Sequence, residues 1–429
     1  KAEQKESEMK TIKLAVIGCG NRGTVYAGYS LLHPDAARVF YACDSSKDRL
    51  EAFGAMFSLP PDRLYTDASE MLEAVEDVDL VIVSTNDDSH FAIAKEVLKR
   101  KHHCLLEKPM SPHAWECVEL VRLAEQNGVS LILGHVLRYT PVFSTIHQLV
   151  HAERAIGDLV AIHHSENVSV DHLVHSYVRG NFRNLSPILL AKSCHDLDIL
   201  CWLTGRRCKK VSSFGHLDFF TEEHAPEGST YRCLDCPVEA TCPFSAVKRY
   251  LGSDTGWPTS MISVDTSLEA RTQALRETNY GVCAFRSDNT VANHQVVNLE
   301  FEDRITVSFV LSGFNTVETR EIRLMGTKGD IFANMEENYI RVRTFGSHEE
   351  RVIRPPVIHV GSHSGGDFLL MQDVVTRLQN NDIHQARAQA SLSLESHLIA
   401  FAAEHARATD TVVLLEDFTR KISNQTIGK

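Results

Sequence analysis

The twelve residues from Ile12 to Gly23, IKLAVIGCGNRG, decide the fold of the first part of the chain. An apolar run of strand length leads directly into three glycines spaced as G-x-G-x-x-G, namely Gly18, Gly20 and Gly23. In such a turn the first glycine permits the tight bend, the second lets the backbone approach a pyrophosphate, and the third lets the following helix pack closely on the strand. The stretch predicts a strand–turn–helix unit that binds a dinucleotide through the helix N-terminus.

The alternation of apolar runs and helical segments continues to about residue 138. We expect strands at 12–17, 38–43, 80–84, 103–107 and 129–133, and helices at 21–32, 47–57, 68–74, 92–100 and 111–127. Near-continuous apolar strands separated by helices are typical of a parallel sheet that is covered on both faces. The fold class is therefore α/β, with a doubly wound Rossmann domain over residues 11–138. Residues 1–10 form a charged tail that we expect to be disordered or added for expression.

After about residue 139 the pattern changes to alternation between polar and apolar residues, which indicates antiparallel strands with one covered face. The expected strands lie at 159–168, 296–310 (with a turn at 302–303), 320–325, 330–334 and 339–344, and the expected helices at 187–203, 367–378 and 384–408. We therefore expect a second, α+β domain over residues 139–429, built on an open, mainly antiparallel sheet. Residues 221–265 form a Cys-, Pro- and Gly-rich insertion in this domain.

Composition narrows the classes of partner. The 44 basic and 56 acidic residues give a net charge of −12, which argues against a nucleic-acid-binding surface. No apolar run approaches the roughly 18 residues of a membrane span, so no membrane partner is expected. The eleven cysteines are an odd number and are scattered along the chain, as is typical of reduced thiols in a cytoplasmic protein.

The nucleotide site should extend to the end of the second expected strand. Asp44 lies 21 residues after Gly23, where a carboxylate accepts hydrogen bonds from the adenosine ribose hydroxyls. Because an acidic group there repels a 2′-phosphate, NAD is favoured over NADP, although Lys47 and Arg49 lie close enough in sequence to soften that preference. A Rossmann-like domain that holds no nucleotide is the alternative. Further expected contacts with the cofactor are Asn21, Arg22 and Ser45.

Four segments together resemble the glucose–fructose oxidoreductase / inositol dehydrogenase (Gfo/Idh/MocA) family. They are the 18–23 loop, Ser84-Thr85-Asn86 followed by His90, Glu107-Lys108-Pro109, and His195-Asp196 followed by Trp202-Leu203-Thr204-Gly205. The Glu-Lys-Pro tripeptide is the most specific of them, and the resemblance covers essentially the whole length. It implies an NAD(P)-binding Rossmann domain, an active site between that domain and the second one, and a homo-oligomer (dimer or tetramer) formed through the exposed face of the open sheet.

The resemblance also implies roles for individual residues. Thr85, Asn86, His90, Glu107 and Lys108 are expected at the cofactor, and Lys108 and His195 at the reacting hydroxyl. A partly desolvated lysine beside a nicotinamide has its pKa lowered toward working pH, which suits proton transfer. A lysine that only binds the cofactor ribose is the alternative.

One position departs from the family pattern. Its dehydrogenases usually carry an aspartate four residues before the histidine, and here that residue is Ala191, followed by Lys192. Either Lys192 replaces the missing group as a third catalytic residue, or the proton relay is built differently. The departure puts an ordinary polyol substrate in doubt.

A dense polar stretch between residues 163 and 183 predicts a carbohydrate-binding surface, because sugars need many donors and acceptors. It resembles a subgroup of the family associated with carbohydrate and glycoside substrates; a solvated, histidine-rich loop is the alternative. The expected substrate contacts are Glu166, His172, His175, Arg179, Asn181 and Asp196. A more weakly indicated contact is the segment from His363 to Asp367.

Cys233-x-x-Cys236-x5-Cys242 is a compact cluster in the insertion. Three thiolates at these spacings can wrap a tetrahedral ion, and a structural zinc needs four ligands. Cys283 is the preferred fourth ligand, with Cys208 and His224 behind it. Three reduced cysteines without metal are an equally good interpretation.

Three functions remain open at this point. The first is an NAD-dependent dehydrogenase that acts on a secondary hydroxyl of a sugar, glycoside or cyclitol. The second is an NAD-dependent glycosidase, in which transient oxidation of the sugar permits elimination, water addition and re-reduction. The third, disfavoured by Lys108 and His195, is a non-catalytic NAD or sugar sensor.

Overall fold

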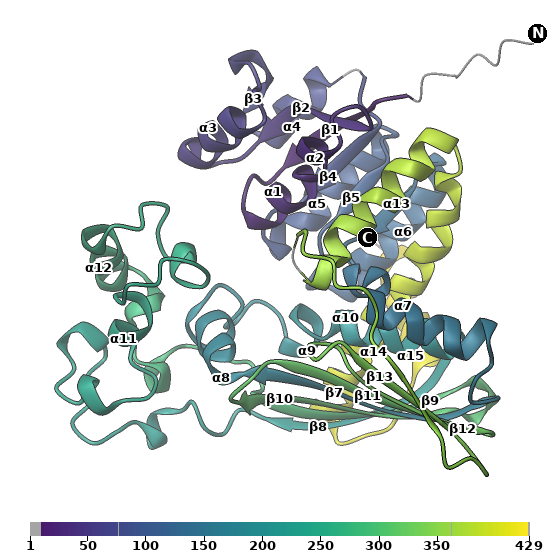
Figure 1. Cartoon of the computed structure of the whole chain (residues 1–429). Coiled ribbons are helices and arrows are strands. Elements are labelled where there is room, and N and C mark those ends of the chain that lie inside the picture. Colours follow the sequence, from purple (N-terminus) through teal and green to yellow (C-terminus); the bar gives the residue numbers. More distant parts are fainter. Residues whose placement is uncertain (1–9, 76, 362, 428–429) are drawn as a thin grey trace, which may run out of the picture.

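The computed structural model describes residues 10–75, 77–361 and 363–427, with only the backbone of residues 384, 386–389, 391–392 and 425–427. It contains two sheets, one for each expected domain (Figure 1). One is a six-stranded parallel sheet and the other a nine-stranded, mainly antiparallel sheet. The predicted fold class is confirmed. Most of the predicted N-terminal tail lies outside the described residues.

The first sheet has the order β3-β2-β1-β4-β5-β6, and its strands pair in parallel. Its strands are β1 Ile12–Ile17, β2 Ala37–Cys43, β3 Leu64–Tyr65, β4 Leu80–Val83, β5 Cys104–Leu106 and β6 Leu131–Leu133. Its helices are α1 Asn21–Ala27, α2 Tyr29–Leu32, α3 Lys47–Met56, α4 Ala68–Ala74, α5 Asp87–Lys99 and α6 Ala114–Asn127. Apolar side chains of alternate strand positions feed two separate cores, one on each face of the sheet. This is the doubly wound arrangement that the apolar strands predicted.

Three local predictions differ from the structure. The single helix expected over 21–32 is divided into α1 and α2, with Gly28 between them. The helix expected from residue 92 begins earlier, at Asp87, because Asn86 in extended conformation provides its N-cap. The two-residue strand β3 was not predicted, since two residues carry no periodic signal.

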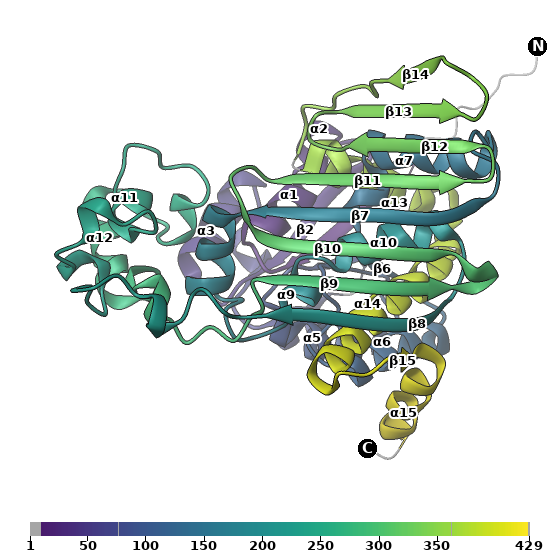
Figure 2. The same ribbon diagram turned by 90° about the horizontal axis from the view of Figure 1, so that it is seen from below.

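The second sheet has the order β14-β13-β12-β11-β7-β10-β9-β8-β15. Its strands are β7 Leu159–Ser169, β8 Cys208–His216, β9 His294–Phe301, β10 Thr306–Asn315, β11 Thr319–Gly326, β12 Gly329–Asn334, β13 Tyr339–Thr344, β14 Glu350–Ile353 and β15 Val413–Leu414. All neighbours pair antiparallel except β7 and β10, which are parallel. Helices cover one face, and the view from below shows the strands of the other face in front of helices such as α7, α10 and α13 (Figure 2). This one-sided cover explains the alternation in the sequence.

Two C-terminal helices tie the second domain to the first. The helices after residue 139 are α7 Pro141–His147, α8 Val170–His172, α9 Ile188–Ala191, α10 Cys194–Thr204, α11 Ala246–Tyr250, α12 Leu268–Glu277, α13 Gly366–Asn380, α14 Ala386–Thr409 and α15 Leu415–Ile427. Apolar side chains of α13 join a core of the Rossmann domain, and α14 packs on α6 and β6 as well as on α10 and β8. The helices α13 and α14, which follow residue 138 in sequence, therefore also pack on the Rossmann domain.

The insertion expected over 221–265 stands apart from both sheets, together with α12 (Figure 1). It consists of short 3-10 turns and the five-residue helix α11. Its small core joins Cys233, Tyr250 and Leu275 with Ala246, Ile262 and Ala274. Among the residues described, no helix is long and apolar enough to cross a membrane.

Candidate cofactor and active site

The glycine-rich turn after β1 has the geometry of a dinucleotide loop. Gly18 has φ +96°, and a Cβ there would lie 2.5 Å from the carbonyl oxygen of Ser84. A Cβ at Gly23 would lie 2.0 Å from the carbonyl oxygen of Gly18, whereas a Cβ at Gly20 would meet nothing within 4 Å. Gly18 and Gly23 are thus required by the protein itself, while Gly20 leaves open space beside its backbone. These three environments fit a backbone that approaches a pyrophosphate.

Asp44 follows β2 and is anchored at this turn. One carboxylate oxygen accepts from the backbone N–H of Cys19 at 2.9 Å, and the other from the N–H of Ser46 at 2.8 Å. The half-exposed Arg49 places its Nε 3.4 Å from the same carboxylate. The predicted positions Asn21 and Ser45 are exposed beside the turn. The carboxylate of Asp44 is therefore held beside the glycine-rich turn, with the guanidinium of Arg49 next to it.

Three predicted cofactor contacts have partners within the protein instead. Arg22 donates to Tyr26 and Asp367 and lies 3.4 Å from Glu107, and Glu107 is buried and also accepts from Tyr26. The ring nitrogens of the fully buried His90 lie 2.7 Å and 3.1 Å from the carbonyl oxygens of Pro109 and Thr85. These side chains hold the turns after β1, β4 and β5 together. Their predicted contact with the cofactor stays a prediction, and in this structure their polar atoms have partners within the protein.

Lys108 reaches from the carboxyl end of β5 into the second domain. Its Nζ donates to the carbonyl oxygen of Ala191 at 2.8 Å, at the end of α9. The peptide bond between Lys108 and Pro109 is cis. Ala191 lies one turn before His195, which begins α10 together with Cys194. The structure thus brings the two predicted proton-transfer residues together from segments 87 positions apart.

His195 is 3 % exposed, and neither of its ring nitrogens has a hydrogen-bond partner among the described residues. Burial lowers its pKa well below the ordinary value, and the charges of Lys108, His363, His135 and Arg320 lower it further. The imidazole is therefore neutral at pH 7. A neutral histidine with unpartnered ring nitrogens is suited to accept a proton from a bound hydroxyl.

Lys192, the third predicted catalytic residue, is bound to carboxylates. Its Nζ lies 2.6 Å from Glu318 and 3.5 Å from Glu166. Glu318 also accepts from Nδ1 of His172 at 2.8 Å. Although burial opposes it, these partners hold the pKa of Glu318 well below its ordinary value. Lys192 therefore supplies a positive charge beside Ala191, in a network that keeps a carboxylate ionised.

Glu166 and Asp196, two predicted substrate contacts, are fully buried and share one guanidinium. Arg320 lies opposite Glu166 in the β7–β11 register and places its Nε 2.6 Å from Glu166 and 3.0 Å from Asp196. Asp196 also accepts from Nε2 of His164 at 2.8 Å. Burial raises the pKa of Glu166 to about 8, whereas Arg320 and His164 outweigh burial and lower the pKa of Asp196. Both side chains are buried between the sheet and α10, so direct contact with a substrate is not supported.

The remaining predicted substrate residues diverge. His172 lies in the Lys192–Glu318 network, whereas Nδ1 of His175 is 2.8 Å from the hydroxyl of Tyr250, and burial lowers the pKa of His175 to about 3. Asn181 is exposed. Arg179 is 2 % exposed and donates to the carbonyls of Val282 and Phe244 and to the sulfur of Cys233. The predicted contact of Arg179 with the substrate stays a prediction, and in this structure its guanidinium donates to groups of the protein instead.

The four predicted zinc ligands line one pocket in the insertion. Cys233, Cys236, Cys242 and Cys283 surround it together with Arg179. Arg286 donates to the sulfur of Cys283 at 3.9 Å. No three of these four sulfurs lie within 4.8 Å of one another, so a closed tetrahedral site is not preformed in the described residues.

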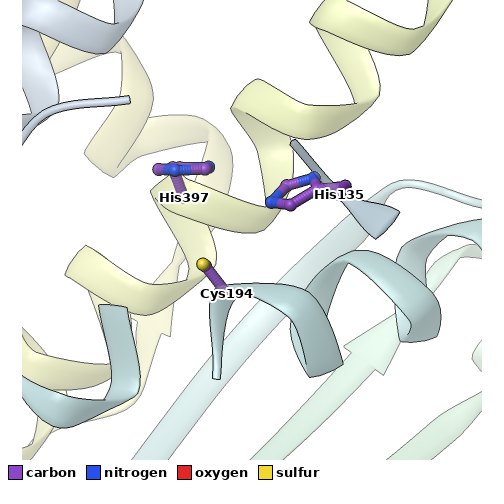
Figure 3. Close-up of side chains that lie close together, drawn as sticks. All are labelled: His135, Cys194 and His397. Atoms are coloured by element: carbon purple, nitrogen blue, oxygen red, sulfur yellow. The ribbon is translucent and has the colours of Figure 1, made fainter. Parts of the chain in front are cut away.

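A different group of metal-ligand types does lie that close. Ligand atoms of His135, Cys194 and His397 are within 4.8 Å of one another, where the end of β6, α10 and α14 meet (Figure 3). Nε2 of His397 already accepts from the backbone N–H of Met110 at 3.0 Å, and its Nδ1 is 2.7 Å from the carbonyl oxygen of Ser393. Burial raises the pKa of the Cys194 thiol to about 12. Because both ring nitrogens of His397 have partners within the protein and burial favours the protonated thiol of Cys194, we assign no metal here.

Sequence reasoning did not identify Arg320 and Glu318, which complete the charged network. The available signal was a pair of opposite charges at the start of a strand whose alternate positions are apolar. An acidic and a basic residue at a strand end are common on any surface. The pairing of β11 with β7 places Arg320 opposite Glu166, and Glu318 contacts Lys192.

Residues 12–135 match the family model described as "Oxidoreductase family, NAD-binding Rossmann fold", GFO_IDH_MocA. The match covers the glycine-rich turn, Asp44 and the Lys108 segment described above. The resemblance to the Gfo/Idh/MocA family is thereby confirmed, and the match lies in the NAD-binding Rossmann domain.

Relatives extend the similarity beyond the Rossmann domain. The putative oxidoreductase YteT of Bacillus subtilis is 23% identical over 72% of this chain and 74% of its own length. Inositol 2-dehydrogenase 2 of Paenarthrobacter aurescens is 28% identical over 47% of this chain and 58% of its own length. Glycosyl hydrolase family 109 protein 3 of Phocaeicola vulgatus is 32% identical over 28% of this chain, but the match spans only 22% of that protein.

Solved structures share the fold over nearly the whole chain. An oxidoreductase domain protein from Kribbella flavida superposes with a TM-score of 0.71 at 18% identity and covers 95% of this chain and 100% of its own. An oxidoreductase from Agrobacterium radiobacter, solved with NAD+, L-tartaric acid and magnesium, has a TM-score of 0.68 at 15% identity and covers 95% and 99%. At these identities the similarity establishes the two-domain fold.

Proposed function

We propose that the protein is an NAD-dependent dehydrogenase that oxidises a secondary hydroxyl of a sugar, glycoside or cyclitol. The observation that carries the proposal is the hydrogen bond from Lys108 to Ala191, which joins the end of a cofactor-domain strand to the turn before His195. This bond supports the proposal because ligands bind at the carboxyl ends of the strands in parallel sheets, and Lys108 follows such an end.

The chain's own residues then divide the work of proton transfer. Bound NAD supplies the hydride acceptor. The Lys108 ammonium stabilises the negative charge that develops on the substrate oxygen, and the neutral His195 accepts the hydroxyl proton. Lys192, paired with Glu318 and His172, orients the substrate hydroxyls near Ala191. The inositol dehydrogenase among the relatives supports a polyhydroxylated substrate.

The test measures NADH released per active site with excess NAD and a panel of free sugars, inositols and methyl or aryl glycosides. We expect NADH to exceed the enzyme concentration many-fold on at least one class of substrate. No NADH and no consumption of any member of the panel would overturn the proposal.

Redox-neutral glycoside cleavage is the second candidate. It is favoured by Ala191 in place of the family's aspartate and by the relative in glycosyl hydrolase family 109. In that case the panel would show about one equivalent of NADH or less, while a glycoside is still consumed and its aglycone released. This outcome would replace the first proposal by the second.

The preference for NAD over NADP is also a proposal. It is supported by Asp44, which is anchored at the turn after β1, and opposed by Arg49, which lies 3.4 Å from it. Titration with both cofactors, followed by protein fluorescence, should give tighter binding of NAD. Asp44→Ser should narrow or reverse that preference, whereas equal binding by the wild type would contradict the assignment.

We also retain the structural zinc as a proposal for the cysteine pocket. Its support is the arrangement of four cysteines around one pocket, with two arginines donating to their sulfurs, because cationic donors stabilise thiolates. The sulfurs would draw together on binding. Elemental analysis of purified protein should find about one zinc per chain, and Cys236→Ser should abolish it. Protein that contains no zinc and keeps its stability with chelator would exclude the site.

Assembly and location complete the proposal. The open face of the second sheet is the expected interface of a homo-oligomer, and it carries the neighbouring side chains of Phe214, Val296 and Val310. All eleven cysteines are free thiols, which supports the cytoplasm as the location.

A further inference from the structure

The imidazole of His363 lies beside that of His195. Their ring centroids are 5.7 Å apart, at an interplanar angle of 52°. This separation lets one hydroxyl group or one water contact both rings. His363 comes from the segment before α13, and the sequence offers no local pattern that would pair it with α10.

The orientation of His363 is fixed by a buried carboxylate. Its Nδ1 lies 3.0 Å from Asp367, which is 1 % exposed and lies in the first turn of α13. Because a carboxylate accepts, Nδ1 carries the proton, and Nε2 is the basic nitrogen of the ring. Aspartate–histidine pairs of this kind set the tautomer of a general base and stabilise its protonated form.

The same carboxylate is tied to the cofactor turn. Its other oxygen accepts from Nη2 of Arg22, which belongs to the glycine-rich turn. The charged groups that act on His363 are Asp367, Arg22 and Arg320, in addition to the neighbouring His195. A rigid connection therefore runs from the dinucleotide loop through Arg22 and Asp367 to the ring that faces His195.

The backbone of residues 363–366 has left-handed residues and close contacts with neighbouring segments. His363, Ser364 and Gly365 have φ of +50°, +51° and +85°, so three successive residues are left-handed. A Cβ at Gly365 would lie 2.5 Å from the side chain of Ile358, and one at Gly366 would lie 2.6 Å from the carbonyl oxygen of Val136. Left-handed conformations of non-glycine residues persist only where the surrounding structure imposes them.

We infer that His363, oriented by Asp367, is a second proton-transfer residue of this active site. It acts with His195 in a chain that lacks the family's usual aspartate at Ala191. The inference rests on the proposed function, since it concerns the proton that leaves the oxidised hydroxyl.

The reaction balances without a further reagent. The C–H bond breaks with its electron pair, which goes to the nicotinamide, so the carbinol is oxidised and NAD+ is reduced to NADH. The O–H bond breaks as the carbonyl forms, and its proton passes to His195 and on to Nε2 of His363. Asp367 stabilises the resulting imidazolium, and exchange with water releases the proton.

The kinetic test compares His363→Ala, Asp367→Asn and the matched control His359→Ala, which removes an exposed histidine four residues earlier. On a substrate identified with the panel above, we expect kcat to fall about 100-fold or more for His363→Ala and about tenfold for Asp367→Asn. KM and the dissociation constant of NAD should stay within about threefold, and the fall in kcat should lessen as pH rises. A kcat for His363→Ala within threefold of the control overturns the inference.

A second readout separates failure of the inference from failure of the proposed function. In protein labelled with 15N-histidine, the His363 resonance, assigned by its loss in His363→Ala, should report protonated Nδ1 and unprotonated Nε2 at pH 7. Asp367→Asn should change this tautomer. A wild type that turns over no substrate overturns the proposed function, and the inference with it, even where the tautomer is as expected. An Nε2-protonated His363 overturns the inference alone.

Discussion

Gly20 and Gly23 lie in the same loop, but the space around them differs. The backbone at Gly23 leaves no space for a side chain, whereas the backbone at Gly20 adjoins open space and has φ −74°, which any residue adopts. Packing of the protein therefore requires glycine at position 23. At position 20, close approach of the cofactor is the reason for glycine. The sequence motif presents both as equal members of one pattern.

We expect Gly23→Ala to lower the free energy of unfolding by about 1–3 kcal/mol or more, since a carbonyl oxygen occupies the site of the new methyl group. Gly20→Ala should leave stability within about 0.5 kcal/mol and weaken NAD binding at least about tenfold. Thermal unfolding and cofactor titration of the pair measure both effects. Equal loss of stability in the two variants would contradict this division of roles.

Lys108 offers a sharper test of catalysis at the residue scale. Among the described residues its Nζ donates one hydrogen bond, to the carbonyl oxygen of Ala191, so Lys108→Met should fold and retain NAD. Turnover should fall about 10²–10⁴-fold, because the charge that faces the developing oxyanion is removed. A variant with unchanged turnover would show that the lysine only binds the cofactor, and a ligand response that survives without turnover in the wild type would indicate a sensor.

At the scale of elements, the pairing of β7 with β11 places a charged network on the covered face of the sheet. Glu166 and Arg320 are directly opposite in register, and α10 brings Asp196 onto the same guanidinium. Burial raises the pKa of Glu166, and the neighbouring negative charge of Asp196 raises it further. Through Asp196 this network contacts the first turn of α10, where His195 also lies.

We expect the free energy of unfolding of the wild type to fall relative to that of Glu166→Gln as pH rises from about 4.3 to 8. In this window the folded wild type keeps a proton that the unfolded chain has released, so the wild type alone loses about 1.4 kcal/mol per pH unit from this group. Denaturant unfolding at pH 5, 6, 7 and 8 measures the slope. The exposed Glu349→Gln is the control, and parallel curves for Glu166→Gln and the wild type would refute the assignment.

At the scale of the whole molecule, the nine-stranded sheet is covered on one face only (Figure 2). Phe214 is 62 % exposed on that face and lies beside Val296, which in turn pairs with Val310. An apolar row on an uncovered sheet is expected to pack against a second copy.

We therefore expect Phe214→Glu to shift the protein toward smaller assemblies, since a buried, unpaired carboxylate destabilises an interface. Light scattering coupled to gel filtration measures the molar mass. Val264→Glu, an equally exposed apolar position in the insertion, is the control and should not change it. A wild type that is monomeric at micromolar concentration would dismiss the interface.

The sequence by itself determined the Rossmann domain and the three-glycine turn, and it predicted Asp44, Lys108 and His195 as site residues. These features follow from local periodicity and from motifs whose spacing is set by one turn or one strand. Tertiary structure alone decided which charges meet. Arg179 contacts Cys233 in the cysteine pocket, and Glu166 and Asp196 contact Arg320. The ring of His363 lies beside that of His195. These contacts join segments that are far apart in the chain, so they depend on strand register and helix packing. Short-range sequence patterns carry no information about strand register or helix packing.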